Sequence, residues 1–127
     1  MTSDTRGRGR AGEAIAASFL EARGYTILAR NLRVGRSELD LVAERGRLLV
    51  VIEVKWRPSG EAFGGAVEAW RAAQRARAAA AWFAIRTTFP DGAVRPCRFD
   101  LVTIEEDVHG LRLDHHRAAW SPAGAWG

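Results

Sequence analysis

Residues 37–57 read SELDLVAERGRLLVVIEVKWR and predict two β-strands joined by a short turn. The first strand is expected over residues 37–44 and the second over residues 47–56, where a run of large apolar side chains begins at Leu48. We expect the turn at Arg45 and Gly46, because glycine readily takes the positive φ that a tight hairpin needs. The segment therefore predicts an antiparallel pair of strands.

Charged side chains gather near one end of this predicted hairpin. Glu38 and Asp40 are expected on one face of the first strand, and Glu53 and Lys55 on one face of the second. Buried charges at a strand end are costly unless a metal ion, a phosphate or another charge faces them. A register with Glu38 opposite Glu53 would bring Asp40 within one diagonal step of Glu53. Three carboxylates and one ammonium group would then converge.

Asp40, Glu53 and Lys55 are residue types suited to metal-dependent hydrolysis of a phosphodiester. Hard cations such as Mg²⁺ prefer oxygen ligands, commonly carboxylates together with water and phosphate oxygens. A bound ion lowers the pKa of a water molecule, and the lysine would orient that water or help to deprotonate it. The alternative is a structural cross-strand salt-bridge network, in which the carboxylates of Glu38 and Glu53 pair with Lys55 and with nearby Arg36 or Arg57.

The rest of the chain predicts a single α/β domain. The expected order is helix, three strands, helix, two strands, and the second helix is a crossover that places the fourth strand parallel to the third. The result is a mixed sheet with helices packed on it. The expected helices cover residues 11–23 and 66–86, and the further strands cover 25–32, 99–104 and 111–115. A flexible basic arm is expected over 1–10, the domain over 11–120 and a frayed tail over 121–127.

Charge is distributed unevenly along the 127 residues. The chain has 19 Lys and Arg against 15 Asp and Glu, a net charge of +4, and Lys55 is its one lysine. Residues 1–36 and 70–98 are net basic, whereas residues 37–69 are net acidic. This pattern suits a carboxylate site flanked by arginines that hold a polyanion. The alternative is an arginine-rich chain in which arginine takes ordinary surface positions.

Several classes of protein are excluded by composition and motif context. Cys97 is the single cysteine, so neither an intramolecular disulfide framework nor a cysteine-based zinc cluster is expected. The longest strongly apolar run, residues 48–52, is too short to cross a bilayer, and the N-terminus shows no secretory signal. Residues 7–12 spell GxGxxG, but no strand precedes them, so a dinucleotide site is rejected. We expect a soluble cytoplasmic protein without a membrane partner.

The hairpin segment resembles the YraN-like family of uncharacterised bacterial proteins, which belongs to the PD-(D/E)xK, or restriction-endonuclease-like, nuclease superfamily. This resemblance implies a single α/β domain with an αβββαβ core. It covers most of the chain, about residues 9–120, and rests also on Gly12-Glu13, Gly24-Tyr25, Arg30-Asn31, Arg98-Phe99-Asp100 and Ala119-Trp120.

The resemblance implies a role for each charged residue of the hairpin. Asp40 and Glu53 match the two metal-binding acids of the motif, and Lys55 matches its lysine. Glu38 and Glu13 match further acids of the family, so all five residues are expected in the catalytic group. The second-helix lysine of the family is replaced by Arg71 here, which would preserve a phosphate contact. The residues expected to contact nucleic acid are Arg36, Arg57, Arg71 and Arg75.

The function expected from the sequence is a metal-dependent endonuclease that hydrolyses DNA phosphodiester bonds with Mg²⁺ or Mn²⁺, on branched or repair intermediates. A homodimer would suit cleavage of two strands. The first alternative is a non-catalytic nucleic-acid-binding module of the same fold, since fold alone does not establish function. The second is a protein-interaction domain in which the charged cluster is structural.

Overall fold

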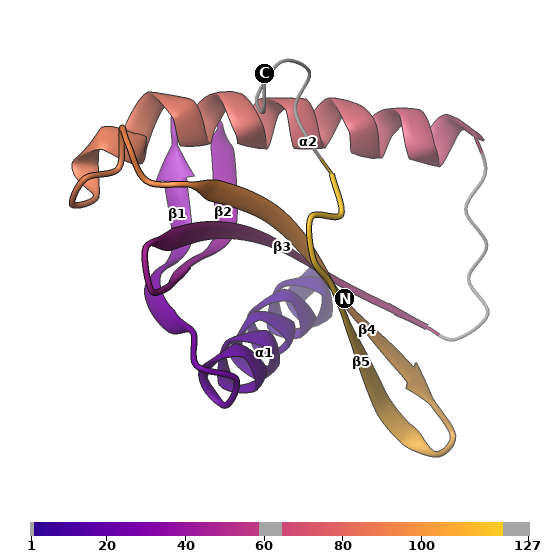
Figure 1. Ribbon diagram of the computed structural model, residues 1–127. Coiled ribbons are helices and arrows are strands. Elements are labelled where there is room, and N and C mark those ends of the chain that lie inside the picture. Colours follow the sequence, from indigo (N-terminus) through magenta and orange to yellow (C-terminus); the bar gives the residue numbers. More distant parts are fainter. Residues whose placement is uncertain (1, 59–64, 121–127) are drawn as a thin grey trace.

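Two long helices and a five-stranded sheet form the described part of the chain (Figure 1). The computed structural model describes the backbone of residues 2–58 and 65–120, and the side chains of residues 10–56 and 72–120. The elements in chain order are α1 (Thr2–Glu21), β1 (Thr26–Val34), β2 (Ser37–Arg45), β3 (Leu48–Pro58), α2 (Gly65–Ile85), the short 3₁₀ helix η1 (Arg86–Thr88), β4 (Cys97–Asp107) and β5 (Gly110–His116).

The strands lie in the sheet in the same order as in the chain. β3 and β4 are parallel, and the other neighbouring pairs are antiparallel. A parallel pair needs a crossover connection, and α2 supplies it. The predicted single α/β domain, its mixed sheet and its αβββαβ order are therefore confirmed.

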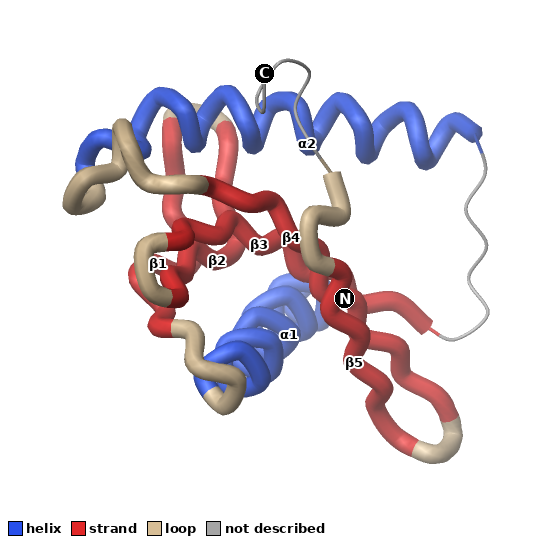
Figure 2. Tube along the Cα trace, viewed as in Figure 1, coloured by secondary structure: helices blue, strands red, loops and turns tan. Residues whose placement is uncertain are grey.

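Each long helix covers its own face of the sheet, as Figure 2 shows. Ala16 and Leu20 of α1 pack on one face, and Ala79 and Trp82 of α2 pack on the other. β2, β3 and β4 each contribute buried residues to both faces, and the apolar run that begins at Leu48 in β3 agrees with this burial. The sheet residues under α1 are Leu41, Ala43, Val50, Ile52, Val102 and Ile104, and those under α2 are Leu39, Val42, Leu49, Val51, Cys97 and Phe99.

Two sequence expectations are corrected by the fold. α1 begins at Thr2 and not at residue 11, so residues 2–10, which were expected to precede the helix, belong to it. The β2–β3 turn is Gly46–Arg47, with Arg45 opposite Leu48 and Gly46 at φ +61°. This turn lies one residue later than expected and shifts the register by two residues, an even shift that by itself does not exchange the faces of a strand.

The expected frayed tail, residues 121–127, lies outside the described residues. Among the described residues, no helix is long and apolar enough to cross a membrane.

A buried ionic network ties β4 and β5 to the segment that follows them. Asp100 is fully buried, and its two carboxylate oxygens accept hydrogen bonds of 2.8 Å from Nε and Nη2 of Arg98. His115 Nε2 lies 2.8 Å from Asp100 Oδ2, and the backbone N–H of Ala118 donates to Oδ1 at 2.9 Å. These partners hold the pKa of Asp100 below its usual value despite the opposing effect of burial.

We expect Asp100→Ala to lower the free energy of unfolding by about 3–5 kcal/mol, because it leaves Arg98 without its buried counter-charge. Asp114→Ala is a matched control on β5: Asp114 pairs with Arg112 at the surface, where removal costs less than about 1 kcal/mol. Urea unfolding of both variants measures the difference. Equal losses would show that the Asp100 network is not a main support of the fold.

Candidate functional site

A pocket of about 380 Å³ lies where β2 and β3 meet α2. Asp40 and Glu53 line it from the sheet, and Gln74 and Arg75 line it from the helix. Carboxylates therefore share one concave site with basic and apolar side chains. The remaining lining residues are Arg33, Arg36, Ser37, Glu38, Leu39, Val51, Ile52, Arg77, Ala78 and Trp120.

The regular alternation of β2 side chains between the two faces of the sheet is interrupted at Asp40. Leu39 packs on the α2 side of the sheet and Leu41 on the α1 side, although residues two apart on a regular strand share a face. The β2–β3 ladder ends at the pair Leu41 and Ile52. Beyond it, the backbone N–H of Val54 donates to Asp40 Oδ2 at 2.8 Å. The Asp40 carboxylate thus takes the place of a backbone acceptor where the two strands separate.

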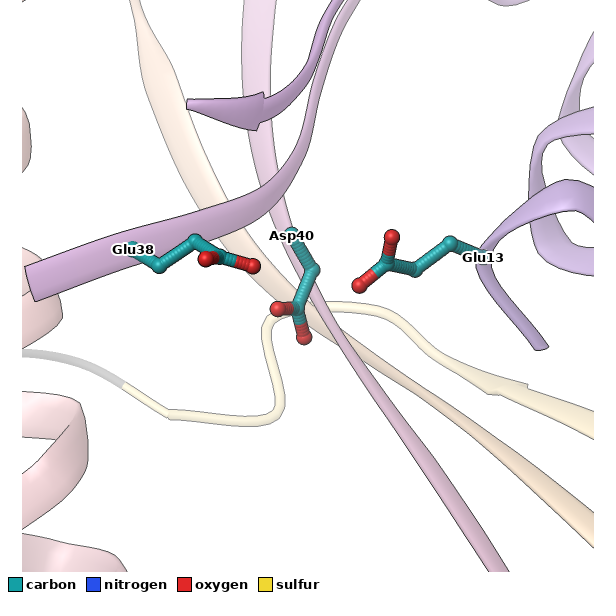
Figure 3. Close-up of side chains that lie close together, drawn as sticks. All are labelled: Glu13, Glu38 and Asp40. Atoms are coloured by element: carbon teal, nitrogen blue, oxygen red, sulfur yellow. The ribbon is translucent and has the colours of Figure 1, made fainter. Parts of the chain in front are cut away.

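Glu13, Glu38 and Asp40 form an acidic cluster (Figure 3). Each offers one carboxylate oxygen, and these three oxygens lie within 4.8 Å of one another. Glu13 comes from α1, where the preceding Gly12 packs so closely on β3 that an added Cβ would lie 3.2 Å from the Trp56 ring. This close approach of the helix places Glu13 beside the separating ends of β2 and β3.

Glu53 and Lys55 form the second half of the site, on the face of β3 that looks toward α2. Glu53 Oε1 lies 3.1 Å from Lys55 Nζ, and Glu53 Oε2 accepts a hydrogen bond of 3.2 Å from Arg75 Nε. Lys55 Nζ also donates to Gln74 Oε1 at 3.3 Å. The Glu53 side chain is 11% exposed, so its charge is largely desolvated and its two cationic neighbours compensate it.

Burial and neighbouring charges change the pKa of two carboxyl groups in the acidic cluster. Burial raises the pKa of Asp40 to about 6, and Glu53 and Glu38 add to the increase, although the N–H of Val54 and the charge of Lys55 oppose it. Burial also raises the pKa of Glu13, and the charge of Asp40 adds to that increase. Strong perturbation in a pocket is typical of functional carboxylates.

The raised pKa of Asp40 makes a prediction about stability. Because the native state holds this proton more tightly than the unfolded chain, whose pKa is near 3.8, stability falls as the pH rises from about 4 to about 6. Asp40→Asn removes the charge and keeps an acceptor for Val54. We expect it to raise the free energy of unfolding by up to about 3 kcal/mol at pH 8 and by only about 1 kcal/mol at pH 4.5.

Urea unfolding at the two pH values measures this effect. Asp91→Asn is the control, because Asp91 is exposed and pairs with Arg47 at the surface, and it should change the free energy of unfolding by less than about 1 kcal/mol. Destabilisation by Asp40→Asn at pH 8, or the same gain at both pH values, would contradict the prediction.

The structure brings most of the sequence-predicted site residues together. Asp40 and Glu53 line one pocket, and Glu38, Arg36 and Arg75 line it with them. Glu13 joins through the acidic cluster, and Lys55 through its contact with Glu53. The three-carboxylate cluster, however, contains Glu13 and not Glu53, which is paired with cations. The side chains of Arg57 and Arg71 lie outside the described residues.

Nine lining residues were not predicted as part of the site, and among them are Arg33, Gln74, Arg77 and Trp120. The available signal for Arg77 was its place in the net basic stretch of residues 70–98. The positions of Arg33 and Trp120 depend on the hairpin turn and on the chain that follows β5, which periodicity does not specify. Gln74 is uncharged, and sequence reasoning gave no reason to select it.

Comparison with known proteins places the chain among bacterial relatives. The family model of the uncharacterised protein family UPF0102 matches residues 12–104. A UPF0102 protein of Symbiobacterium thermophilum is 44% identical over 105 residues, which cover 80% of this chain and 85% of that protein. A UPF0102 protein of Bacteroides thetaiotaomicron is 38% identical over 114 residues, which cover 90% of this chain and 92% of that protein.

The comparison with solved structures found Pyrococcus furiosus SfsA in complex with Ca²⁺. The two chains have 14% sequence identity and a TM-score of 0.40, and the match covers 89% of this chain and 63% of SfsA.

Proposed function

The chain belongs to the UPF0102 family, which is the YraN-like family expected from its sequence, and we propose that it is a metal-dependent nuclease that hydrolyses DNA phosphodiester bonds. The observation that carries the proposal is the meeting of Asp40, Glu53 and Lys55 at a pocket rimmed by arginines. Carboxylates, an ammonium group and guanidinium groups in one concave site are the groups that phosphodiester hydrolysis uses. The proposal places the chain in the PD-(D/E)xK superfamily.

The donor groups of the pocket fit a hard divalent cation. All four acidic residues near it offer carboxylate oxygens, the ligands that Mg²⁺ and Mn²⁺ prefer. Glu13 Oε2 is buried and has no hydrogen-bond partner among the described residues, as expected of a carboxylate that lacks a counter-ion. We propose Asp40 and Glu53 as the ligands of Mg²⁺ or Mn²⁺, with Glu13 and Glu38 adding negative charge. A bound ion would supply Lewis-acid chemistry and a more acidic water molecule.

The chain's own residues would perform the remaining tasks. Lys55, held by Glu53 and Gln74, would orient the attacking water and stabilise charge that develops on the phosphoryl oxygens. Arg36 and Arg75 line the same pocket, where they would bind the phosphates beside the scissile bond. In this proposal a compact ammonium group contacts the reacting phosphate, and guanidinium groups contact the adjacent phosphates of the strand.

A second candidate function is a non-catalytic nucleic-acid-binding module. The observation that favours it is the pairing of Glu53, whose two oxygens already contact Lys55 and Arg75. Ion pairs of this kind compensate a buried carboxylate without any metal ion. Such a module would keep the arginines and bind polyanions in a salt-dependent way, but it would not cleave them.

The nuclease proposal predicts that Lys55→Ala lowers the rate of DNA cleavage in Mg²⁺ or Mn²⁺ by at least about 100-fold, because a group that stabilises the transition state is lost. DNA affinity should change little. Arg112→Ala removes a basic side chain that pairs with Asp114 on β5, and it should cleave at the normal rate. Gel assays of cleavage and fluorescence anisotropy of binding separate the two effects. DNA binding without cleavage in either metal would favour the non-catalytic module.

Metal binding should depend on pH through Asp40. Protons compete with the cation for a carboxylate whose pKa is raised to about 6. We expect Mn²⁺ affinity, measured by titration calorimetry without DNA, to fall progressively below pH 6 and to fall at least about tenfold in Asp40→Asn at pH 7.5. The Asp91→Asn variant serves again as the control. Equal Mn²⁺ affinity in the wild type and Asp40→Asn would exclude Asp40 as a ligand.

A further inference from the structure

One wall of the pocket is apolar, which a phosphodiester group alone does not require. Leu39, Val51, Ala78 and Trp120 line the pocket, and all four belong to the apolar cluster under α2. This wall joins the core to the pocket, which Asp40 and Glu53 also line. Ligand sites with an apolar wall and a few polar groups bind molecules that have both characters.

Trp120 contributes an aromatic side chain to this wall. Its ring packs on Phe99, with 4.4 Å between the ring centroids. Its indole Nε1 is buried and has no hydrogen-bond partner among the described residues. The indole N–H groups of Trp56 and Trp82 are buried and unpaired in the same way, so the feature that Trp120 offers the pocket is its aromatic ring.

Guanidinium groups line the pocket from two separate elements. Arg33 and Arg36 come from the β1–β2 hairpin, and Arg75 and Arg77 come from α2. Arg33 contacts Glu38 at 3.7 Å and is 72% exposed, so it keeps donors for a second partner. Arginines on two sides can bind successive phosphates of one strand.

We propose that this pocket receives one nucleotide whose base has left the helical stack, with the base against the Trp120 wall and its phosphate toward Asp40 and Glu53. This inference rests on the proposed function and specifies its substrate: a single-stranded segment, such as an unpaired end or the arm of a branched DNA. The pocket volume of about 380 Å³ lies in the range of about 300–1,000 Å³ typical of sites for small ligands. A base inside an intact duplex is stacked and paired, so it reaches such a pocket only after extrusion.

Binding to a strand with missing bases tests the inference. The Lys55→Ala protein in Mg²⁺ is titrated with three fluorescein-labelled DNAs of equal length: a single strand, the same strand with a run of abasic sites, and the intact blunt duplex. The abasic strand keeps every phosphate, so it isolates the contribution of the bases. We expect it to bind at least about tenfold more weakly than the normal strand, because stacking of a base on an aromatic side chain contributes substantially to affinity.

Two leucine substitutions locate the effect. Trp120→Leu, made in the same protein, keeps an apolar side chain against Phe99 but removes the ring and the N–H, so the two single strands should then bind within about twofold of each other. Affinity for the abasic strand should not change. Phe83→Leu is the matched control, because Phe83 also contacts Phe99 but does not line the pocket. Circular dichroism establishes that both variants are folded.

The outcomes separate this inference from the nuclease proposal. Equal affinity for the normal and abasic strands, or a base preference that survives Trp120→Leu, would overturn the inference. Wild-type protein that cleaves duplex DNA without any dependence on Trp120 would overturn it alone. A Trp120-dependent base preference with no cleavage in Mg²⁺ or Mn²⁺ would overturn the nuclease proposal and retain the nucleotide pocket. Absence of binding to all three DNAs would overturn both.

Discussion

The hydrogen bond from the backbone N–H of Val54 to Asp40 connects the sheet to the site. From the turn as far as the pair Leu41 and Ile52, β2 and β3 form a regular antiparallel ladder in which each strand supplies the backbone hydrogen-bond partners of the other. At Asp40 the side chain becomes the acceptor, so the strands separate without leaving this β3 amide unsatisfied. This hydrogen bond also holds the Asp40 carboxyl group in a poorly solvated position, where its ionised form is costly. The fold thus holds Asp40 where its charge requires compensation.

The negative charges of the four carboxylates are not equally balanced by positive neighbours. Glu53 has two cationic neighbours, Lys55 and Arg75, whereas Glu13 and Asp40 lie beside each other and Glu38. The positive charge is therefore on the α2 side of the site, and the excess negative charge is next to α1. This separation explains why burial and acidic neighbours raise the pKa of Asp40 and Glu13. A cation entering between these groups would meet least competition on the α1 side.

Alternation along β2 and β3 was sufficient to predict that carboxylates and a lysine would meet, but not how they would pair. The actual register differs by two residues from the expected one, and an even shift preserves the faces of a strand. An odd shift would have separated Asp40 from Glu53. The change of face between Leu39 and Leu41 could not be predicted, because it depends on Asp40 replacing a backbone acceptor. Likewise, no local pattern places Trp120 at the pocket, since its position depends on packing against Phe99.

Lysine and arginine are not interchangeable around Glu53. Lys55 follows Glu53 by two residues on the same strand and the same face, so its side chain starts beside the carboxylate, and its Nζ lies 3.1 Å from Glu53 Oε1. Arg75 comes from α2 on a long side chain, and its contact with Glu53 is separable from the fold of the strand. A cation or phosphate that arrives at Glu53 would therefore displace the guanidinium group first, which then becomes available to a neighbouring phosphate. The lysine would stay at the reacting group, as a compact ammonium donor should.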